Sequence, residues 1–393
     1  MTSRLCSCLP LFAALVSLAP VSAHAARVVF VNTEPVTIVG GATNDPAADT
    51  VNVNNFMDTD FDGWAGASDE QKAELLALLK DTSVAFDIEF VLERPAEGPY
   101  DMVVFGSADD HASSFGGNCS TAVGLSDCSD QNGVSLAFAY WGCLDEADQL
   151  DPERVAFSAL TALGFGWGLE GLGGNGQVMA QWSNNALEWG TTCTNLSGAG
   201  NCPHLECDAG QQNSTADLLA NLGARVDDGP PVITVIEPTP GSDVEEPFNV
   251  RVEIDDAFGG VEAALSIVDL DVPPVIDDAY PYEWANLAIG AGPTTLQVTA
   301  TDADGNSVST EIPVCVGGGC PDDDPETGGE SETSGGEEES SGSGETGGSA
   351  GAEAGGADGG EGGGCSVGGQ AGRDFIPFGL LALVGLLALR RRG

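Results

Sequence analysis

The stretch Thr161-Ala162-Leu163-Gly164-Phe165-Gly166-Trp167-Gly168-Leu169-Glu170-Gly171 decides how the first part of this chain folds. It closes a helix that we expect to begin at Asp151-Pro152, because aspartate is a good N-cap and proline suits the first helical position. Gly168 is expected to end that helix. The apolar residues of its buried face are Val155, Ala159, Leu160 and Leu163.

The spacing within this stretch resembles that of the metzincin zinc proteases, whose pattern is H-E-x-x-H-x-x-G-x-x-H. The turn glycine of the pattern falls on Gly168, and the histidine positions fall on Thr161, Phe165 and Gly171. The general base falls on Ala162. None of these side chains offers an imidazole to zinc or takes a proton from water. The resemblance therefore implies a protease fold that has lost its active centre and binds no zinc.

The histidine count agrees with this interpretation. The chain has only three, His24, His111 and His204, and His24 lies in a predicted signal peptide. Two scattered histidines cannot form a three-histidine zinc site. The alternative is an active exported metallopeptidase with a repositioned metal site around His111, His204 and nearby acids.

The rest of residues 26–228 predicts an α+β domain. Arg27–Asn32 opens it as a strand of β-branched residues, and Ser68-Asp69-Glu70-Gln71 is a capping box that starts a helix. Further strands are expected at 86–92, 102–105 and 134–140. Val178-Met179 follows the second helix where metzincins place a methionine turn. Asn213–Gly223 resembles the closing helix of exported myxobacterial metallopeptidase-like proteins. An unrelated α+β domain is the alternative.

The two ends of the chain predict export and anchoring. Residues 1–25 have the charge, apolar run and Ala23-His24-Ala25 cleavage site of a signal peptide. At the other end, residues 365–393 contain Cys365 in a glycine-rich context, the apolar run Phe375–Leu389, and the cluster Arg390, Arg391 and Arg392. These three parts resemble the myxobacterial MYXO-CTERM sorting domain.

This resemblance implies a transmembrane helix, processing near Cys365 by a sorting protease, and display at the cell surface. A plain tail anchor in the envelope membrane is the alternative. The apolar run would span roughly 22 Å as a helix, so flanking residues would have to help it cross a ~30 Å hydrocarbon core.

Between the first domain and the anchor, the chain changes composition twice. Residues 229–316 alternate apolar and polar side chains, as in Phe248–Ile254, and Asp304-Gly305 is a hairpin signal. They predict an all-β immunoglobulin-like sandwich. Residues 317–364 are rich in Gly, Ser and Glu, and we expect a disordered acidic linker there because such a chain buries little apolar surface.

Eight of the eleven cysteines remain if the signal and sorting segments are set aside. An even number in an exported protein predicts disulfides, although six cysteines in one domain leave 15 pairings open. Cys202-Pro203-His204-Leu205-Glu206-Cys207 could instead supply metal ligands, but its spacing fits no standard zinc site. The eight disulfide candidates are Cys119, Cys128, Cys143, Cys193, Cys202, Cys207, Cys315 and Cys320.

The segment Asp58-Thr59-Asp60-Phe61-Asp62-Gly63 has the D-x-D-x-D-G opening of a calcium loop, in which alternate carboxylates converge on one cation. Asp69 takes the twelfth position, where a glutamate is usual, so weak calcium binding is the expectation. The alternative is an acidic turn that caps the Ser68 helix.

The formal net charge is −49, and this acidity argues against nucleic-acid binding, which needs a basic surface. The chain also lacks a G-x-S-x-G elbow, an H-E-x-x-H motif and a P-loop. We therefore expect a catalytically inactive, surface-anchored binding or structural protein. We expect its ligand to lie on the cell surface or in the matrix.

Overall fold

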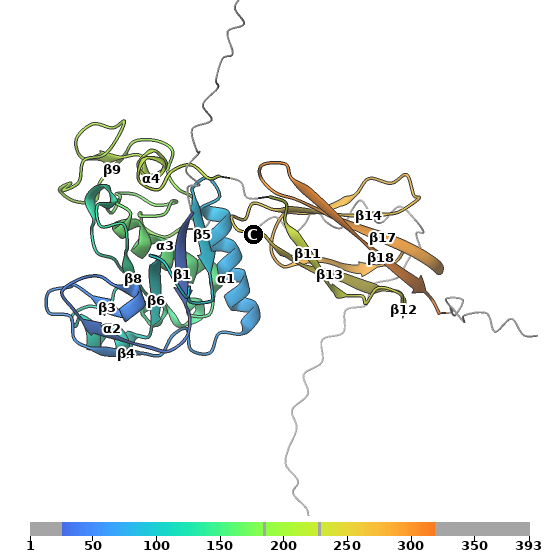
Figure 1. Ribbon diagram of the computed structural model, residues 1–393, viewed down its shortest axis with the longest axis horizontal. Coiled ribbons are helices and arrows are strands. Elements are labelled where there is room, and N and C mark those ends of the chain that lie inside the picture. Colours follow the sequence, from blue (N-terminus) through green and yellow to red (C-terminus); the bar gives the residue numbers. More distant parts are fainter. Residues whose placement is uncertain (1–25, 184–185, 227–228, 319–393) are drawn as a thin grey trace, which may run out of the picture. The chain divides into compact units, whose positions relative to one another are not determined.

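The structure is a computed structural model that describes residues 26–183, 186–226 and 229–318. Two folded regions with separate hydrophobic cores make up these residues, and each is considered by itself (Figure 1). The first is mixed α/β and the second is built of β-strands. Among the described residues, none of the helices is long and apolar enough to span a membrane. The predicted signal peptide, most of the linker and the sorting segment lie outside the described residues.

The first region is built on a five-stranded sheet. Its strands are β1 (Arg27–Asn32), β5 (Ile88–Val91), β6 (Asp101–Gly106), β7 (Ala122–Val123) and β8 (Leu136–Tyr140). Their order is β5-β1-β6-β8-β7, and only β7 runs antiparallel to its neighbour. β6 and β8 are buried along their whole length, as expected for parallel strands covered on both faces.

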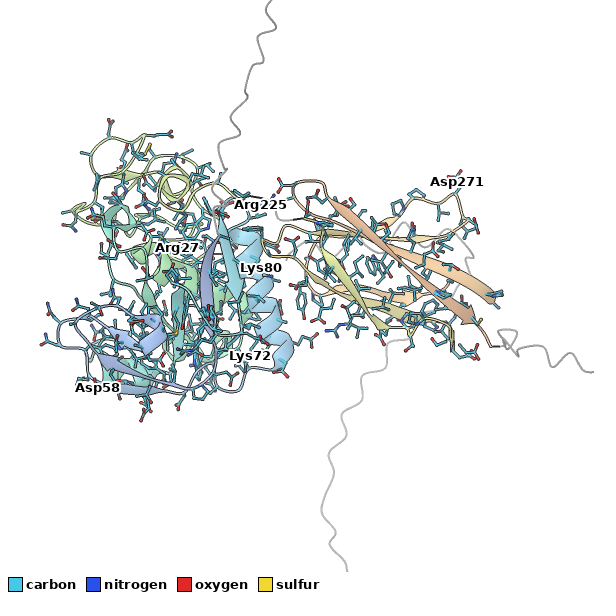
Figure 2. The ribbon with its side chains drawn as sticks, viewed as in Figure 1. Arg27, Asp58, Lys72, Lys80, Arg225 and Asp271 are labelled. Carbon is cyan, nitrogen blue, oxygen red and sulfur yellow. A yellow bond between two sulfur atoms is a disulfide. The ribbon has the colours of Figure 1, made fainter. Side chains whose placement is uncertain are left out.

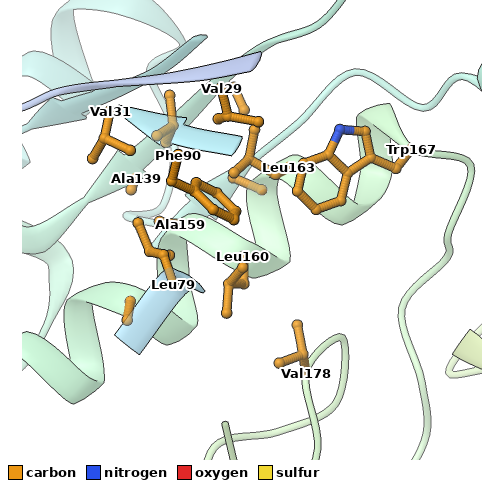
Figure 3. Packing of buried hydrophobic residues seen from close by; sticks show 14 of the residues in the cluster. Val29, Val31, Leu79, Phe90, Ala139, Ala159, Leu160, Leu163, Trp167 and Val178 are labelled. Atoms are coloured by element: carbon orange, nitrogen blue, oxygen red, sulfur yellow. The ribbon is translucent and has the colours of Figure 1, made fainter. Parts of the chain in front are cut away.

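One face of this sheet packs against α1 (Asp69–Thr82) and α3 (Pro152–Gly166). The expected capping box at Ser68 and Gln71 is present, and Asp151 caps α3 by accepting from the Glu153 amide. Leucines of both helices meet the strands, as the close-up of this core shows (Figure 3). The helix starts expected from sequence are therefore confirmed.

The opposite face carries an aromatic core and shorter elements that sequence analysis did not predict. These are β2 (Val36–Gly40), β3 (Thr50–Val51), β4 (Thr59–Phe61) and α2 (Ala108–Ser114). Phe61 of β4 stacks on Phe138 of β8, with ring centroids 5.4 Å apart. Because side chains alternate along a strand, β8 sends Ala137 and Ala139 to one core and Phe138 to the other.

The end of the first region is irregular and rich in cysteine. It contains β9 (Thr194–Asn195), β10 (Gln211–Gln212) and α4 (Ser214–Leu222). α4 is capped by the side chain of Asn213, which accepts from the Ala216 amide, and it ends at Gly223. A closing helix at these residues was expected.

The second region is a sandwich of two sheets around one apolar core. One sheet contains β11 (Val232–Glu237), β13 (Phe248–Asp255) and β16 (Tyr282–Leu287) in that order. The other has the order β12-β18-β17-β14-β15. Its strands are β12 (Ser242–Val244), β14 (Glu262–Ile267), β15 (Val275–Asp277), β17 (Gly292–Thr301) and β18 (Ser307–Val316). The expected all-β region is confirmed, including the β17–β18 hairpin at Asp304-Gly305.

Candidate functional site

α3 places the metal-ligand positions of the sequence pattern on one helical turn and the residues after it. Ala162 is fully buried, and Thr161 and Phe165 are partly buried. The Oγ1 atom of Thr161 is buried and has no hydrogen-bond partner among the described residues. Gly171 lies beyond the end of the helix, close to Ser197. The only polar side-chain atom on this turn is therefore the neutral hydroxyl of Thr161, and the other side chains are hydrocarbon.

The chain just after β7 closes over this turn. A Cβ atom on Gly124 would overlap the carbonyl oxygen of Ala162 and lie 2.8 Å from the Cβ of Phe165. Only glycine allows the backbone to approach α3 so closely. The turn is thus covered by backbone of the same region.

Met179 packs against the same helix from another side. It is buried, and a Cβ atom on Gly164 would overlap its sulfur. Its backbone is left-handed, with φ of 74°. The segment reaches back to the exit of α3, since the Leu172 amide donates to the Met179 carbonyl over 2.7 Å. Met179 therefore packs against α3, and its interpretation as a methionine turn stays a prediction.

A buried ionic network that sequence analysis missed lies where α3 ends. Asp101 is completely buried and accepts from Trp167 Nε1 over 2.8 Å and from the Ser135 amide over 2.6 Å. Arg27, labelled in Figure 2, donates to the same carboxylate through Nε over 2.6 Å and Nη2 over 2.8 Å. Trp167 is thereby fixed in the core by its indole nitrogen.

Arg27 also contacts Asp130 through Nη1. Burial raises the pKa of Asp130 to about 6, although Arg27 acts in the opposite direction. The Oδ1 atom of Asp130 has no hydrogen-bond partner among the described residues. The Arg27 guanidinium therefore pairs with two carboxylates. It contacts Asp101 through two nitrogens and Asp130 through one.

A second polar cluster joins the exit of α3 to the cysteine-rich end. His204 Nε2 lies 3.0 Å from Glu170 Oε2, and its Nδ1 lies 2.9 Å from Asp217 Oδ2. Burial alone would raise the pKa of Glu170, but hydrogen bonds from Asn201, His204 and Cys202 lower it below its ordinary value. All three side chains are largely buried.

The other described histidine, His111, lies in an aromatic environment. His111 of α2 is buried, with its ring edge-on to Tyr140 at 4.8 Å, and burial lowers its pKa. Its ring contacts Phe115 and Tyr140, whereas the His204 ring contacts Glu170 and Asp217. The described residues contain no group of three His, Cys, Asp or Glu side chains placed to hold a metal ion.

Three disulfides fix one of the 15 pairings left open by sequence. They join Cys119 to Cys143, Cys128 to Cys202, and Cys193 to Cys207. Cys202 and Cys207 therefore belong to two different disulfides, so the interpretation of their segment as a pair of metal ligands is wrong. Cys315 is also disulfide-bonded, and Cys320 lies outside the described residues.

The acidic residues proposed for calcium lie along a strand. Instead of an EF-type loop, residues 59–61 form β4, which pairs with β2. Asp58, labelled in Figure 2, accepts from the Gly40 amide over 2.9 Å, and Asp60 accepts from Thr37 Oγ1 over 2.6 Å. Asp62 follows the strand, and Asp69 is the first residue of α1. Calcium binding stays a prediction.

Neither the comparison with protein-family models nor that with curated proteins found a match. Among solved structures, fibronectin(III)-like modules of Clostridium thermocellum CbhA are 19% identical, with 22% of this chain and 94% of that chain covered and a TM-score of 0.19. The PKD1 domain of Vibrio anguillarum Epp is also 19% identical, with coverages of 23% and 96% and a TM-score of 0.16.

An endo-β-1,4-mannanase from Thermotoga petrophila is 17% identical to this chain. The match covers 26% of this chain and 23% of the mannanase, with a TM-score of 0.19. Similarities of this size carry no inference about what this protein does.

Proposed function

We propose that this chain is a catalytically inactive, metallopeptidase-like protein of the cell surface, with a binding or structural role. The observation that carries the proposal is the covered turn of α3. Where the resemblance requires two histidines and a glutamate, the turn has Thr161, Phe165 and Ala162, and Gly124 packs directly onto it.

The chemistry of that turn supports the loss of catalysis. A catalytic zinc site needs three protein ligands and an open position for water. The only polar side-chain atom on the turn is the Thr161 hydroxyl, which is buried. Met179 beneath α3 and the capped helices support the metzincin-like frame, so the proposal is a retained fold without its chemistry.

In this proposal, the sandwich is an immunoglobulin-like spacer, and the segments at the chain ends provide export and anchoring. The signal peptide would be removed after Ala25. Sorting near Cys365 would place the folded regions outside the envelope, tethered through the acidic linker. The great excess of acidic over basic residues, 61 against 12, suits a soluble, exposed surface.

Proteolysis tests the inactive half of the proposal. We expect the full-length protein to cleave no unfolded protein substrate faster than a buffer control, with or without zinc or a chelator. A repositioned metallopeptidase site would instead give chelator-sensitive cleavage that is lost in a His111→Gln or His204→Gln variant. The folding of each variant would be checked by its melting temperature.

Mass spectrometry tests the anchoring half. We expect surface protein to lack the cluster Arg390–Arg392, and Cys365→Ala to leave it unprocessed or mislocalised. Ser366→Ala is the matched control and should be processed normally. Mature surface protein that still carries the arginines would favour a plain tail anchor.

A further inference from the structure

We propose that the first region carries a preformed binding site of its own, a pocket beside α4 that receives an apolar side chain from a basic peptide segment. This α4 pocket is about 300 Å³ in volume and is lined by Thr191, Leu205, Glu206, Asn213, Ala216 and Leu219, among others. The proposal does not depend on whether α3 holds a metal.

Two of the lining residues are leucines that are exposed to solvent. Leu205 is 51% exposed and Leu219 is 40% exposed. A single exposed leucine on a protein surface needs no explanation. Two in the same concave site leave apolar area that a partner's side chain could remove from water. The pocket volume is at the low end for small-molecule sites, which suits one or two inserted side chains.

The loop that carries Leu205 is fixed from both sides. Cys202 and Cys207 tie its ends to Cys128 and Cys193 through separate disulfides. Between them, the His204 ring is held by Glu170 and Asp217. A loop with these restraints loses little conformational freedom when a partner binds.

The position of Leu205 itself follows from the same restraints. Its amide donates to Asp217 Oδ1 over 2.7 Å. The next residue, Glu206, has a left-handed backbone with φ of 61°, a conformation that is unfavourable for a non-glycine residue. The exposed leucine is therefore held out by the structure around it and does not result from a loosely packed loop.

Charge indicates the kind of partner. Glu206 lines the pocket and Asp208 follows the disulfide, whereas the whole stretch between Arg154 and Arg225 contains no lysine or arginine. A cationic side chain beside the inserted apolar one would meet acidic groups without a competing base in that stretch. The high net negative charge would also speed the approach of a basic segment.

The N-terminus of α4 could in principle favour an anion instead. Its first-turn amides are already used, since Thr215 donates to the Gly190 carbonyl and Ala216 donates to the Asn213 side chain. The Asp217 amide donates to the Asn213 carbonyl. The positive helix end therefore offers few free donors, and the carboxylate of Glu206 decides the preference for a cation.

Peptide binding to the full-length protein tests this site. The probes are fluorescein-labelled peptides of equal length with alternating Lys and Leu, Lys and Ser, or Glu and Leu, measured by anisotropy in a mild non-ionic detergent. We expect only the Lys–Leu peptide to bind well, with an affinity that falls as salt rises. The Lys–Ser peptide controls for general attraction to the acidic surface.

Variants then locate the binding. Leu205→Ser combined with Leu219→Ser should weaken Lys–Leu binding by about tenfold or more. Because both side chains are already exposed, the melting temperature should stay unchanged. Leu150→Ser, at a residue that is 42% exposed elsewhere in the same region, is the matched control and should bind normally.

Glu206→Gln should weaken binding less and reduce its salt dependence. Equal binding of the Lys–Leu and Glu–Leu peptides would overturn the proposal. So would equal binding by the parent protein and the paired leucine variant, because the peptide would then lie elsewhere on the acidic surface.

Discussion

The two folded regions differ in what they bury. The sandwich core is apolar, and Asp302 is the only buried charged side chain among the described residues of the sandwich. The first region buries many polar side chains, including Asp101, His111 and Asp217. The free-energy cost of burying a charged group is large unless the group is paired, so the stability of this region depends on the partners of these side chains.

The first region therefore depends on paired polar groups in its interior, whereas the sandwich does not. The sandwich is stabilised by apolar side chains that alternate along its strands and fill one core. Its single buried carboxylate, Asp302, closes the β17–β18 turn by accepting from the Asp304 and Asn306 amides. In the first region, two buried polar clusters lie at the exit of α3, around Trp167 and Glu170. The turn of α3 itself, onto which the metzincin pattern would place two histidines and a glutamate, carries no charged side chain.

The largest expected effect comes from removing Asp101. Asp101→Ala would leave the Arg27 guanidinium buried with only Asp130, and breaking a buried pair in this way typically costs about 3–5 kcal/mol. Urea unfolding of the full-length protein measures it. Asp101→Asn keeps the shape and an acceptor for Trp167, so it should cost less. A loss below about 1 kcal/mol for the alanine variant would show that the network is not structural.

A matched core variant in the sandwich sharpens the comparison. Leu296→Ala, at a fully buried site, should cost about 2–5 kcal/mol through lost burial and a cavity. The loss should be the same at pH 5 and pH 7.5, because no ionisable group takes part. A pH-dependent loss at this position would contradict an apolar core.

His204→Gln should have an intermediate effect. The two ring nitrogens of His204 face Glu170 and Asp217 separately, whereas a glutamine amide presents its N–H groups from one end, so we expect a loss of about 1–3 kcal/mol at neutral pH. The pKa of Glu170 is lowered in the folded state, so its contribution is present above its ordinary pKa of 4.5 and disappears as pH falls through the folded value. Unfolding curves from pH 7 down to pH 3 should therefore converge for the parent and the variant. Curves that stay parallel would indicate packing alone.

The smallest effect concerns Asp130. Its folded-state pKa of about 6 lies above the ordinary value of 3.8, so the folded state binds the proton more tightly and gains stability as pH falls through 6. Relative to Asp130→Asn, the parent should gain about 1 kcal/mol between pH 7.5 and pH 5. Measuring the free energy of unfolding at both pH values tests this. A parent and variant with the same pH dependence would mean that Asp130 is adequately paired.

Local signals in the sequence predicted much of the first region. The N-terminus of α1 follows from Ser68 and Gln71, and that of α3 follows from Asp151-Pro152, because capping depends on residues close together in the chain. The alternation of Thr59 and Phe61 with the aspartates was also a strand signal. It was masked by the stronger resemblance of the same residues to a calcium loop.

The polar clusters could not be predicted in this way. Arg27 and Trp167 lie 74 and 66 residues from Asp101, and the Cys128–Cys202 disulfide also spans 74 residues. Nothing in the local pattern relates such residues, because the topology of the sheet brings them together. By contrast, Ser107 and Asp110 form a capping box at α2, which was a local signal for a helix that sequence analysis overlooked.

The measurement that tests the proposed loss of the metal centre most directly is the zinc content of full-length protein prepared in zinc-containing medium and dialysed. The α3 turn offers zinc only the buried Thr161 hydroxyl, and the backbone at Gly124 packs onto it. We therefore expect well under one zinc per chain by elemental analysis. The result should be unchanged in Thr161→Ala. One zinc per chain that survives dialysis, and that is lost with His204→Gln or His111→Gln, would contradict a fold without its metal chemistry.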